Sequence, residues 1–132
     1  MVQGRRRVIL NKAFIGVDII EITRIERAAS RWHDAFLKRI YTTAELEYCR
    51  NRYPGLAARF AAKEAVMKAL GSGATGISWH DVEILNEENG KPVVRLHGKA
   101  LRKGEELGVA DFSISLSHCE KYAVALAIGN AL

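Results

Sequence analysis

Short apolar runs with the length and composition of β-strands are the first feature of the chain. The earliest run, residues 13–20, is rich in β-branched side chains and carries one carboxylate, Asp18, near its end. The segments "FSISLSH" at 112–118 and "YAVALAI" at 122–128 alternate between two kinds of side chain. We therefore expect one strand at the start of the sequence and two at its end.

Two further runs predict a β-hairpin. Residues 82–85 and 93–96 are largely apolar and flank the dipeptide Asn89-Gly90. Because Asn and Gly both adopt positive φ angles at little cost, this dipeptide favours a tight turn between two paired strands.

Two segments between these strands have apolar residues at helical spacing. Residues 99–107 predict a short helix that ends at Gly108. Residues 22–32 predict a longer helix with an apolar stripe that packs on the core. The stripe consists of Ile22, Ile25, Ala29 and Trp32.

Two more helices are predicted in the middle of the chain. Thr42 and Glu45 have the spacing of a capping box, which opens a short helix through Arg50. Pro54 suits the first turn of the helix that follows. Together with the strands, these helices predict the α+β class.

The composition indicates an ordinary globular protein. Of the 132 residues, 48% are hydrophobic and 27% are charged. We expect a basic tail over residues 1–12, which include three consecutive arginines, and a single domain over 13–132. The longest apolar run, 122–128, is too short to span a bilayer, so we expect no membrane segment.

Charge and cysteine content restrict the partners and the compartment. The net charge of +5 favours an anionic partner, which could be nucleic acid, a phosphorylated small molecule or an acidic protein. Cys49 and Cys119 have neither CxxC spacing nor a second cluster that would complete a zinc site. A reducing compartment, the cytoplasm, fits best.

The stretch "FAAKEAVMKALGSG", residues 60–73, contains the most distinctive charges. At about 100° per residue, Glu64 and Lys68 are neighbours beside an apolar stripe, as in an exposed i,i+4 ion pair. Glycines follow at 71, 73 and 76, as in a helix C-cap. A glycine-rich turn also lets backbone N–H groups approach a phosphate, although here it follows a helix instead of preceding one. The residues alone leave both readings open.

Asp18 supplies a second carboxylate, and its role is equally open. An Asp between a strand and a helix commonly caps the helix. Two carboxylates with basic residues close by also suit a magnesium ion bound to substrate phosphates, because Mg²⁺ prefers hard oxygen ligands and keeps several waters.

Four segments in order resemble holo-acyl-carrier-protein synthase, the small type of 4′-phosphopantetheinyl transferase. They are "GVDIIEITRI" (16–25), "RFAAKEAVMKALGSG" (59–73), "DVEI" with "NGKP" (81–92) and "SLSH" (115–118). The resemblance covers nearly everything from Gly16 to Ile128, and about a dozen residues at the front exceed the family's usual start. It implies a small antiparallel sheet packed against a long helix.

The resemblance also implies an activity. The phosphopantetheine arm of coenzyme A would be transferred to a serine of apo acyl carrier protein with Mg²⁺, releasing adenosine 3′,5′-bisphosphate and supporting fatty acid biosynthesis. It further implies a homotrimer with sites between subunits, Asp18 coming from one subunit and Glu64 from the other or nearby.

Roles for individual residues follow from the same resemblance. Asp18 and Glu64 would be magnesium ligands, and Lys68 would face the leaving phosphate. The general base is Glu64 or, as we favour, a metal-held water. Residues implied to contact coenzyme A or its phosphates are Arg59, Lys63, Gly71, Gly73 and His118, although a histidine at a strand end is also commonly structural.

The helix at 22–32 predicts a surface for the carrier protein. Arg24, Arg27 and Arg31 fall within about 60° of arc, opposite the apolar stripe. Glu21 and Glu26 lie away from this arc, so we expect its charge to be uncancelled. Acyl carrier proteins are acidic, and guanidinium groups pair well with carboxylates. The alternative is an ordinary solvated face.

A small basic nucleic-acid-binding module is the main competing interpretation, and a non-catalytic assembly subunit is a weaker one. Aromatic residues make up only 8% of the chain, acids are interspersed among the bases, and no nucleic-acid-binding motif occurs. We therefore expect no nucleic acid partner.

Overall fold

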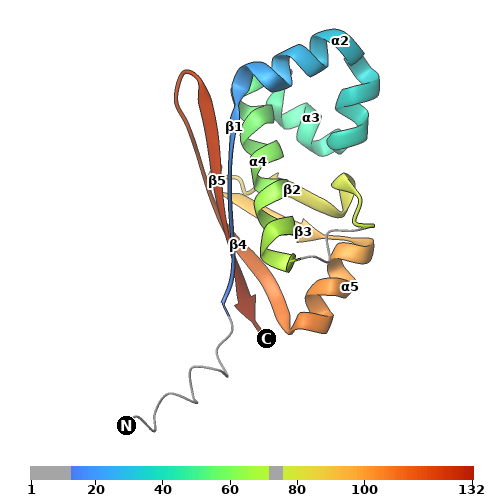
Figure 1. Ribbon diagram of the computed structural model, residues 1–132, viewed down its shortest axis with the longest axis vertical. Coiled ribbons are helices and arrows are strands. Elements are labelled where there is room, and N and C mark those ends of the chain that lie inside the picture. Colours follow the sequence, from blue (N-terminus) through green and yellow to red (C-terminus); the bar gives the residue numbers. More distant parts are fainter. Residues whose placement is uncertain (1–12, 72–75) are drawn as a thin grey trace, which may run out of the picture.

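A computed structural model describes residues 13–71 and 76–132 of the chain. A three-stranded antiparallel sheet, ordered β1-β5-β4, is covered on one face by the long helix α4, and β2 pairs with β3 in a separate sheet (Figure 1). The expected α+β class is confirmed, and the expected tail at 1–12 lies outside the described residues. The elements are β1 (Phe14–Glu21), α2 (Ile22–Ile40), α3 (Thr43–Cys49), α4 (Tyr53–Leu70), the 3₁₀ turn η2 (Trp79–Asp81), β2 (Val82–Asn86), β3 (Pro92–Leu96), α5 (Gly98–Leu107), β4 (Val109–His118) and β5 (Tyr122–Ala131).

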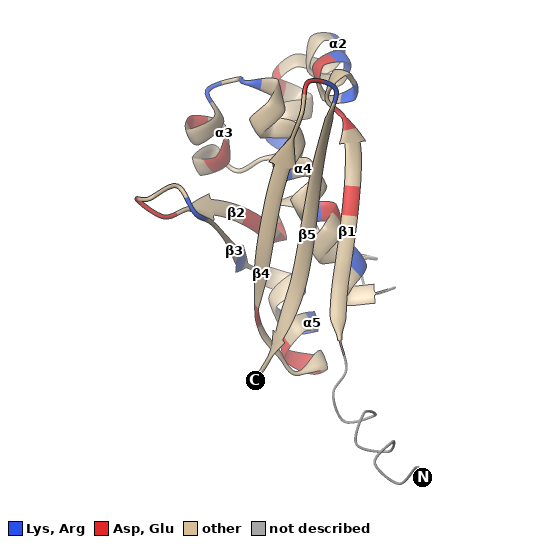
Figure 2. Cartoon of the chain, turned by 90° about the vertical axis from the view of Figure 1, so that its left-hand side faces the viewer, with Lys and Arg blue, Asp and Glu red and all other residues tan. Residues whose placement is uncertain are grey.

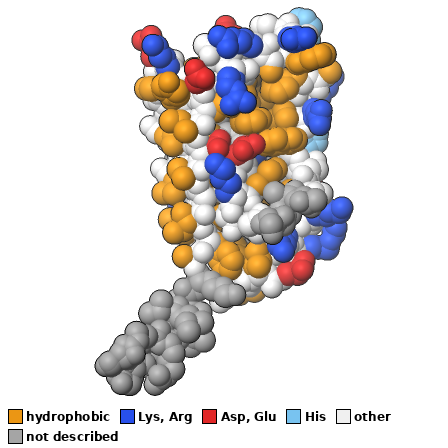
Figure 3. All heavy atoms as spheres, in the orientation of Figure 1, with side chains coloured by type: hydrophobic (Ala, Val, Ile, Leu, Met, Phe, Trp, Pro, Cys, Tyr) orange, Lys and Arg blue, Asp and Glu red, His pale blue; other side chains and the backbone are white. Residues whose placement is uncertain are grey.

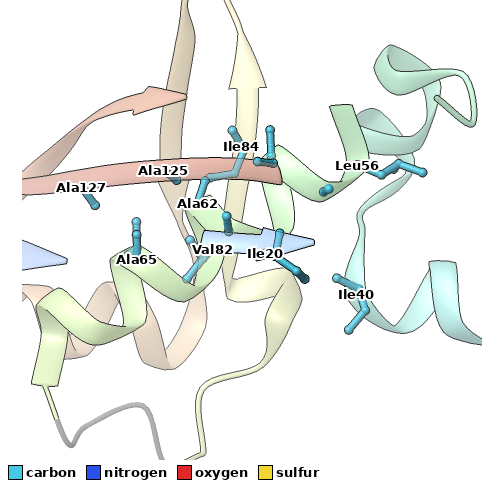
Figure 4. Packing of buried hydrophobic residues seen from close by; sticks show 14 of the residues in the cluster. Ile20, Ile40, Leu56, Ala62, Ala65, Val82, Ile84, Ala125 and Ala127 are labelled. Atoms are coloured by element: carbon cyan, nitrogen blue, oxygen red, sulfur yellow. The ribbon is translucent and has the colours of Figure 1, made fainter. Parts of the chain in front are cut away.

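Small residues let α4 lie very close to the sheet. Ala62 and Ala65 of α4 are fully buried beside Ala125 and Ala127 of β5 (Figure 4). The strand β1 comes closest at Gly16, where an added Cβ would lie 1.8 Å from the carbonyl oxygen of Ala65. Only glycine fits there without moving the strand, so this contact fixes how near side chains on the inner face of β1 come to α4.

The other face of the three-stranded sheet is open and largely apolar. Ile15, Val17 and Ile19 of β1 are 57%, 55% and 63% exposed. Leu126 and Ile128 of β5 are also exposed and stand in register with Val17 and Ile15. Figure 2 looks onto this sheet, in which β4 and β5 are uncharged over most of their length. On β4, the outward residues are Ser113, Ser115 and Ser117.

The local signals for helix ends are confirmed. The Thr42 hydroxyl accepts from the backbone N–H of Glu45, and the Thr42 N–H donates to Glu45 Oε1 at 2.7 Å, which completes the capping box. Pro54 lies in the first turn of α4, and Gly108, with φ +78°, ends α5. Within the described parts of the chain, no helix is both long and apolar enough to cross a membrane.

The helix α2 departs from expectation in length and in one packing residue. It continues to Ile40 through a kink at His33, whose φ of 51° and ψ of −136° are not helical. Ile22, Ile25 and Ala29 are buried as expected, but Trp32, just before the kink, is 57% exposed. Its ring instead lies 5.0 Å from the guanidinium of Arg31, so the prediction that Trp32 packs on the core is wrong.

The hairpin forms with a longer turn than predicted. Five residues, 87–91, separate β2 from β3. A two-residue turn of the expected type needs positive φ at both Asn89 and Gly90, yet only Gly90, at +90°, has it. The Asn89 side chain accepts from the N–H of Lys91 and stabilises the wider loop.

A buried ion pair joins α4 to two neighbouring elements, α3 and β2. Lys63 Nζ lies 2.9 Å from Glu45 Oε1, and both side chains are fully buried. The same ammonium donates to the carbonyls of Trp79 and Val82, and Glu45 Oε2 accepts from the N–H of Ile84. Burial lowers the pKa of Lys63, whereas the charge of Glu45 opposes that shift. The pair therefore ties α3, α4 and β2 together.

Lys63→Met should lower the free energy of unfolding by about 3–5 kcal/mol, because Glu45 would remain buried without its cation. Urea unfolding followed by circular dichroism measures this. Lys99→Met, at an exposed position of α5, is the matched control and should change stability by no more than about 0.5 kcal/mol. If Lys63→Met lowered the free energy of unfolding by less than about 1 kcal/mol, the Lys63–Glu45 pair would not be important for stability.

Candidate active site

An ion pair between β1 and α4 joins Asp18 to Lys68, fifty residues later in the sequence. Asp18 lies on the inner face of β1 with Gly16 and Ile20, the buried residues of that strand. Lys68, in the last turn of α4, places Nζ 2.9 Å from Asp18 Oδ1 and 3.1 Å from the carbonyl oxygen of Val17. Figure 3 shows acidic and basic side chains together over β1 and α4, between apolar ones.

Glu64, one turn before Lys68, belongs to the same electrostatic group. Partial burial and the charge of Asp18 raise the pKa of Glu64, while Lys68 and Arg24 act in the opposite direction. The hydrogen bond to Asp18 raises the pKa of Lys68, which keeps it an ammonium. Two carboxylates that repel each other beside two cations are typical of a functional site, because structural ion pairs rarely need the repulsion.

This geometry decides between the alternatives that the sequence left open. The N-cap position of α2 is Glu21, which makes no side-chain capping bond, so Asp18 does not cap the helix. Lys68 forms its ion pair with Asp18, across to the sheet, instead of the i,i+4 pair along the helix. Within one chain, β1 and α4 already bring Asp18 close enough to Glu64 to raise its pKa, and the division of site residues between subunits stays a prediction.

The donor set at this point fits a magnesium ion bound together with a phosphorylated substrate. In the described residues, no group of three His, Cys, Asp or Glu side chains could hold a metal by itself. Mg²⁺ is commonly held by one or two carboxylates plus substrate phosphates and waters, which matches Asp18 and Glu64. Burial first, and then the charge of Asp18, raise the pKa of Glu64, and a bound cation would favour its ionised form.

Arg59 and His118 belong to a second group of residues, on the other side of α4. Two adjoining cavities of about 380 and 500 Å³ are both lined by Tyr48, Gly55, Arg59 and His118. The Arg59 guanidinium lies 4.8 Å from the Tyr48 ring centroid and donates to the Gly55 carbonyl and to Asn86 Oδ1. Its Nε is buried without a protein partner among the described residues. Because Arg59 is only 5% exposed and this Nε is buried, contact of its guanidinium with an anionic ligand stays a prediction.

The expectation for Lys63 is wrong. Its three ammonium donors are all used, by Glu45 and by the carbonyls of Trp79 and Val82, and the side chain is fully buried, so it does not reach a bound phosphate. Gly71 ends α4 with a φ of +83°, consistent with its C-cap role. Gly73 lies outside the described residues, and phosphate contact by these glycines stays a prediction.

The two groups of site residues lie at opposite edges of the sheet. β1, which carries Asp18, and β4, which ends at His118, are separated by β5. Two strand spacings amount to about 10 Å. On α4, Arg59 and Glu64 are five residues apart and therefore about 140° apart around the helix. One chain thus presents two separate groups of candidate residues.

The arginine face of α2 (Arg24, Arg27 and Arg31) is exposed as expected. Glu26 lines the same shallow cavity of about 470 Å³ as Arg27 and Arg31, but no ion pair joins it to an arginine among the described residues. The expectation that the charge of the arc is uncancelled therefore stays a prediction. Arg24, in the first turn, is close enough to affect the pKa of Glu64.

Sequence reasoning missed three contributors to these surfaces. The backbone carbonyl of Val17 holds Lys68, and Tyr48 and Asn86 hold Arg59. Asn86 lies two residues after the "DVEI" segment, so the sequence placed it near a motif. Tyr48 and the Val17 carbonyl have no signal in the sequence, because only the packing of separate elements brings them into place.

Comparisons with known proteins are consistent with this arrangement. Residues 14–127 match the model of the 4′-phosphopantetheinyl transferase superfamily. The chain is 54% identical over 116 residues to the holo-[acyl-carrier-protein] synthase of Moorella thermoacetica, covering 86% of this chain and 90% of that protein. The Helicobacter pylori holo-[acyl-carrier-protein] synthase, solved in complex with coenzyme A, matches with a TM-score of 0.80 at 31% identity and covers 88% of this chain and 99% of that one.

Glu64→Gln should stabilise the fold at pH 7, by less than about 1 kcal/mol because solvent screens this partly exposed group. Folding raises the Glu64 pKa, so the ionised carboxylate costs stability at neutral pH and the cost disappears as the pH falls through the folded pKa. Thermal unfolding without divalent cations should show a difference between variant and wild type that shrinks from pH 7 towards pH 4. Glu88→Gln, on the exposed hairpin loop, is the control. If Glu64→Gln were less stable than wild type at pH 7, the conclusion that folding raises the pKa of Glu64 would be wrong.

Proposed function

We propose that this chain, which belongs to the holo-[acyl-carrier-protein] synthase family of the 4′-phosphopantetheinyl transferase superfamily, performs its transfer with Mg²⁺ held by Asp18 and Glu64. The phosphopantetheine arm of coenzyme A passes to a serine of apo acyl carrier protein, and adenosine 3′,5′-bisphosphate leaves. The holo carrier protein then serves fatty acid biosynthesis. The observation that carries the metal assignment is the meeting of Asp18, Glu64 and Lys68 between β1 and α4.

The residues of this group have separable tasks. Mg²⁺, when bound, would neutralise charge on the pyrophosphate as its bond breaks. Lys68, with its side chain 54% exposed, can turn its ammonium to a phosphate oxygen of the leaving group. The serine proton goes to Glu64, whose raised pKa suits a base, or to a water beside it. Positioning and charge supply the catalysis, so no nucleophilic side chain is required.

Asp18→Asn should lower kcat/KM for carrier-protein modification by at least about 100-fold, the equivalent of several kcal/mol of lost charge stabilisation. The assay follows the mass increase of apo acyl carrier protein with coenzyme A and Mg²⁺. Glu88→Gln serves as the charge-matched control, and circular dichroism checks the fold. Turnover within a few-fold of wild type in Asp18→Asn would remove the metal assignment.

We further propose that the site is completed between copies of the chain, in a homotrimer. Coenzyme A has a pyrophosphate and, at its other end, a phosphorylated adenosine. The Asp18 group suits the pyrophosphate, and the groove with Arg59 and His118 suits the adenosine end, yet one chain keeps them at opposite edges of the sheet. A ring of copies would place the β1 edge of one against the β4 edge of the next.

The open sheet face supports this ring by the sizes of its side chains. Ile15, Val17 and Ile19 on β1 are large, whereas the outward residues of β4 in the same rows are serines. Large residues at every second position of one edge fit over small residues at every second position of the other. The face measures about 14 Å by 26 Å, or roughly 360 Å², which is comparable to the largest patches that monomers leave exposed and that often serve an interaction.

Val17→Cys with Ser115→Cys should form covalent trimers on mild oxidation, in a Cys119→Ser background. Val17 is the middle of the three large residues on β1, and Ser115 is the middle of the three serines on β4. The two positions therefore meet whether β1 of one copy runs parallel or antiparallel to β4 of the next. Within one chain, Leu126 stands between them. Their Cα atoms are therefore about 10 Å apart, beyond the roughly 7 Å that a disulfide spans. Non-reducing electrophoresis measures the product, with each single cysteine variant as control. Efficient dimers from Val17→Cys alone would indicate a two-fold contact and contradict the ring.

The arginine face of α2 is the proposed docking surface for the carrier protein. Arg24 lies beside Glu64 in the electrostatic group, so a partner bound to this helix would reach the carboxylates. Trp32, exposed at the kink with Arg31 over its ring, adds apolar contact area. Arginine and tryptophan together are typical of binding surfaces for acidic partners.

A further inference from the structure

The ion pair between Lys68 and Asp18 combines one mobile and one enclosed partner. The Lys68 side chain is 54% exposed, whereas that of Asp18 is only 14% exposed. The ammonium holds two acceptors of β1, Asp18 Oδ1 at 2.9 Å and the Val17 carbonyl at 3.1 Å. Asp18 is therefore largely enclosed, and the ammonium of Lys68 occupies one of its two carboxylate oxygens.

A divalent cation at Asp18 meets this ammonium directly. Both are attracted to the same carboxylate, and two cations a few ångströms apart repel each other. An ammonium on a long, half-exposed side chain leaves such a pair at small cost, since exposed ion pairs are weak. Lys68 begins one turn after Glu64, so it can leave Asp18 and still remain beside the carboxylates.

We propose that Lys68 and a divalent cation compete for Asp18, so that Lys68 keeps the cation affinity low until a phosphorylated substrate is present. This inference rests on the proposed function, in which Asp18 is a metal ligand. When the pyrophosphate of coenzyme A arrives, its oxygens offer the ammonium a new partner. Lys68 then releases Asp18 to the cation and binds the group that will leave.

The competition predicts how cation affinity responds to a change at Lys68 alone. In the absence of coenzyme A, Lys68→Met removes the competitor and keeps most of the apolar stem. Arg24→Met is the matched control, because Arg24 acts on Glu64 in the same direction as Lys68 but, in the described part of the chain, makes no hydrogen bond to Asp18. It measures the effect of losing one nearby positive charge.

The experiment titrates each protein with Mn²⁺, which has the same preference for oxygen ligands as Mg²⁺, and follows free Mn²⁺ by electron paramagnetic resonance. Without coenzyme A, Lys68→Met should bind Mn²⁺ at least about tenfold more tightly than wild type. Arg24→Met should gain no more than about threefold, because Arg24 acts on the site only through its field, which salt screens. Lys68→Arg, which keeps a charged partner for Asp18, should retain the weak affinity of wild type.

Three results would overturn the competition. Equal gains in Lys68→Met and Arg24→Met would mean that only the general field matters. Unchanged or weaker binding in Lys68→Met would mean that the ammonium does not compete. Absence of Mn²⁺ binding in every protein, even with coenzyme A, would overturn both the proposed metal site and the competition. Asp18→Asn tests the metal site separately, because this variant should lose Mn²⁺ binding only if Asp18 is a ligand.

Discussion

The close contact between β1 and α4 is the constraint on which the candidate active site depends. Gly16 faces the carbonyl of Ala65 so closely that any Cβ would overlap with it. Two residues further along the same face of β1, Asp18 comes within 2.9 Å of Lys68. A larger residue at position 16 would push the strand away and separate the carboxylate from the lysine. The packing of small side chains, instead of attraction between charges, therefore sets the geometry of the charged group.

Two lysines of α4 show how position around one helix decides what a charge does. Lys63 faces the interior, where Glu45 and two carbonyls use all its donors, so it stabilises the fold. Lys68, five residues later and about 140° round, reaches the edge strand and is half exposed. The buried lysine cannot move without a large loss of stability, whereas the exposed one can change partners. The same residue type thus provides rigidity on one side of the helix and adaptability on the other.

The sheet has different roles on its two faces and its two edges. Its inner face packs against α4 and orients Asp18, while the outer face exposes a row of large apolar residues beside a row of serines. One edge carries the carboxylates and the other ends at His118 beside the Arg59 groove. One chain thus leaves an apolar sheet face exposed and holds its two groups of candidate residues apart, which is why the proposed function links assembly and activity.

The sequence by itself determined the strands, most helix ends and the α+β class, because periodicity, the Thr42 capping box and Gly108 act through residues a few positions apart. Its motifs also pointed to the right family and to Asp18 with Glu64. The kink at His33 and the burial of Lys63 were decided only by the tertiary structure. Periodicity shows which side chains share a face but not what that face meets, and in three dimensions the neighbours come from elements tens of residues away.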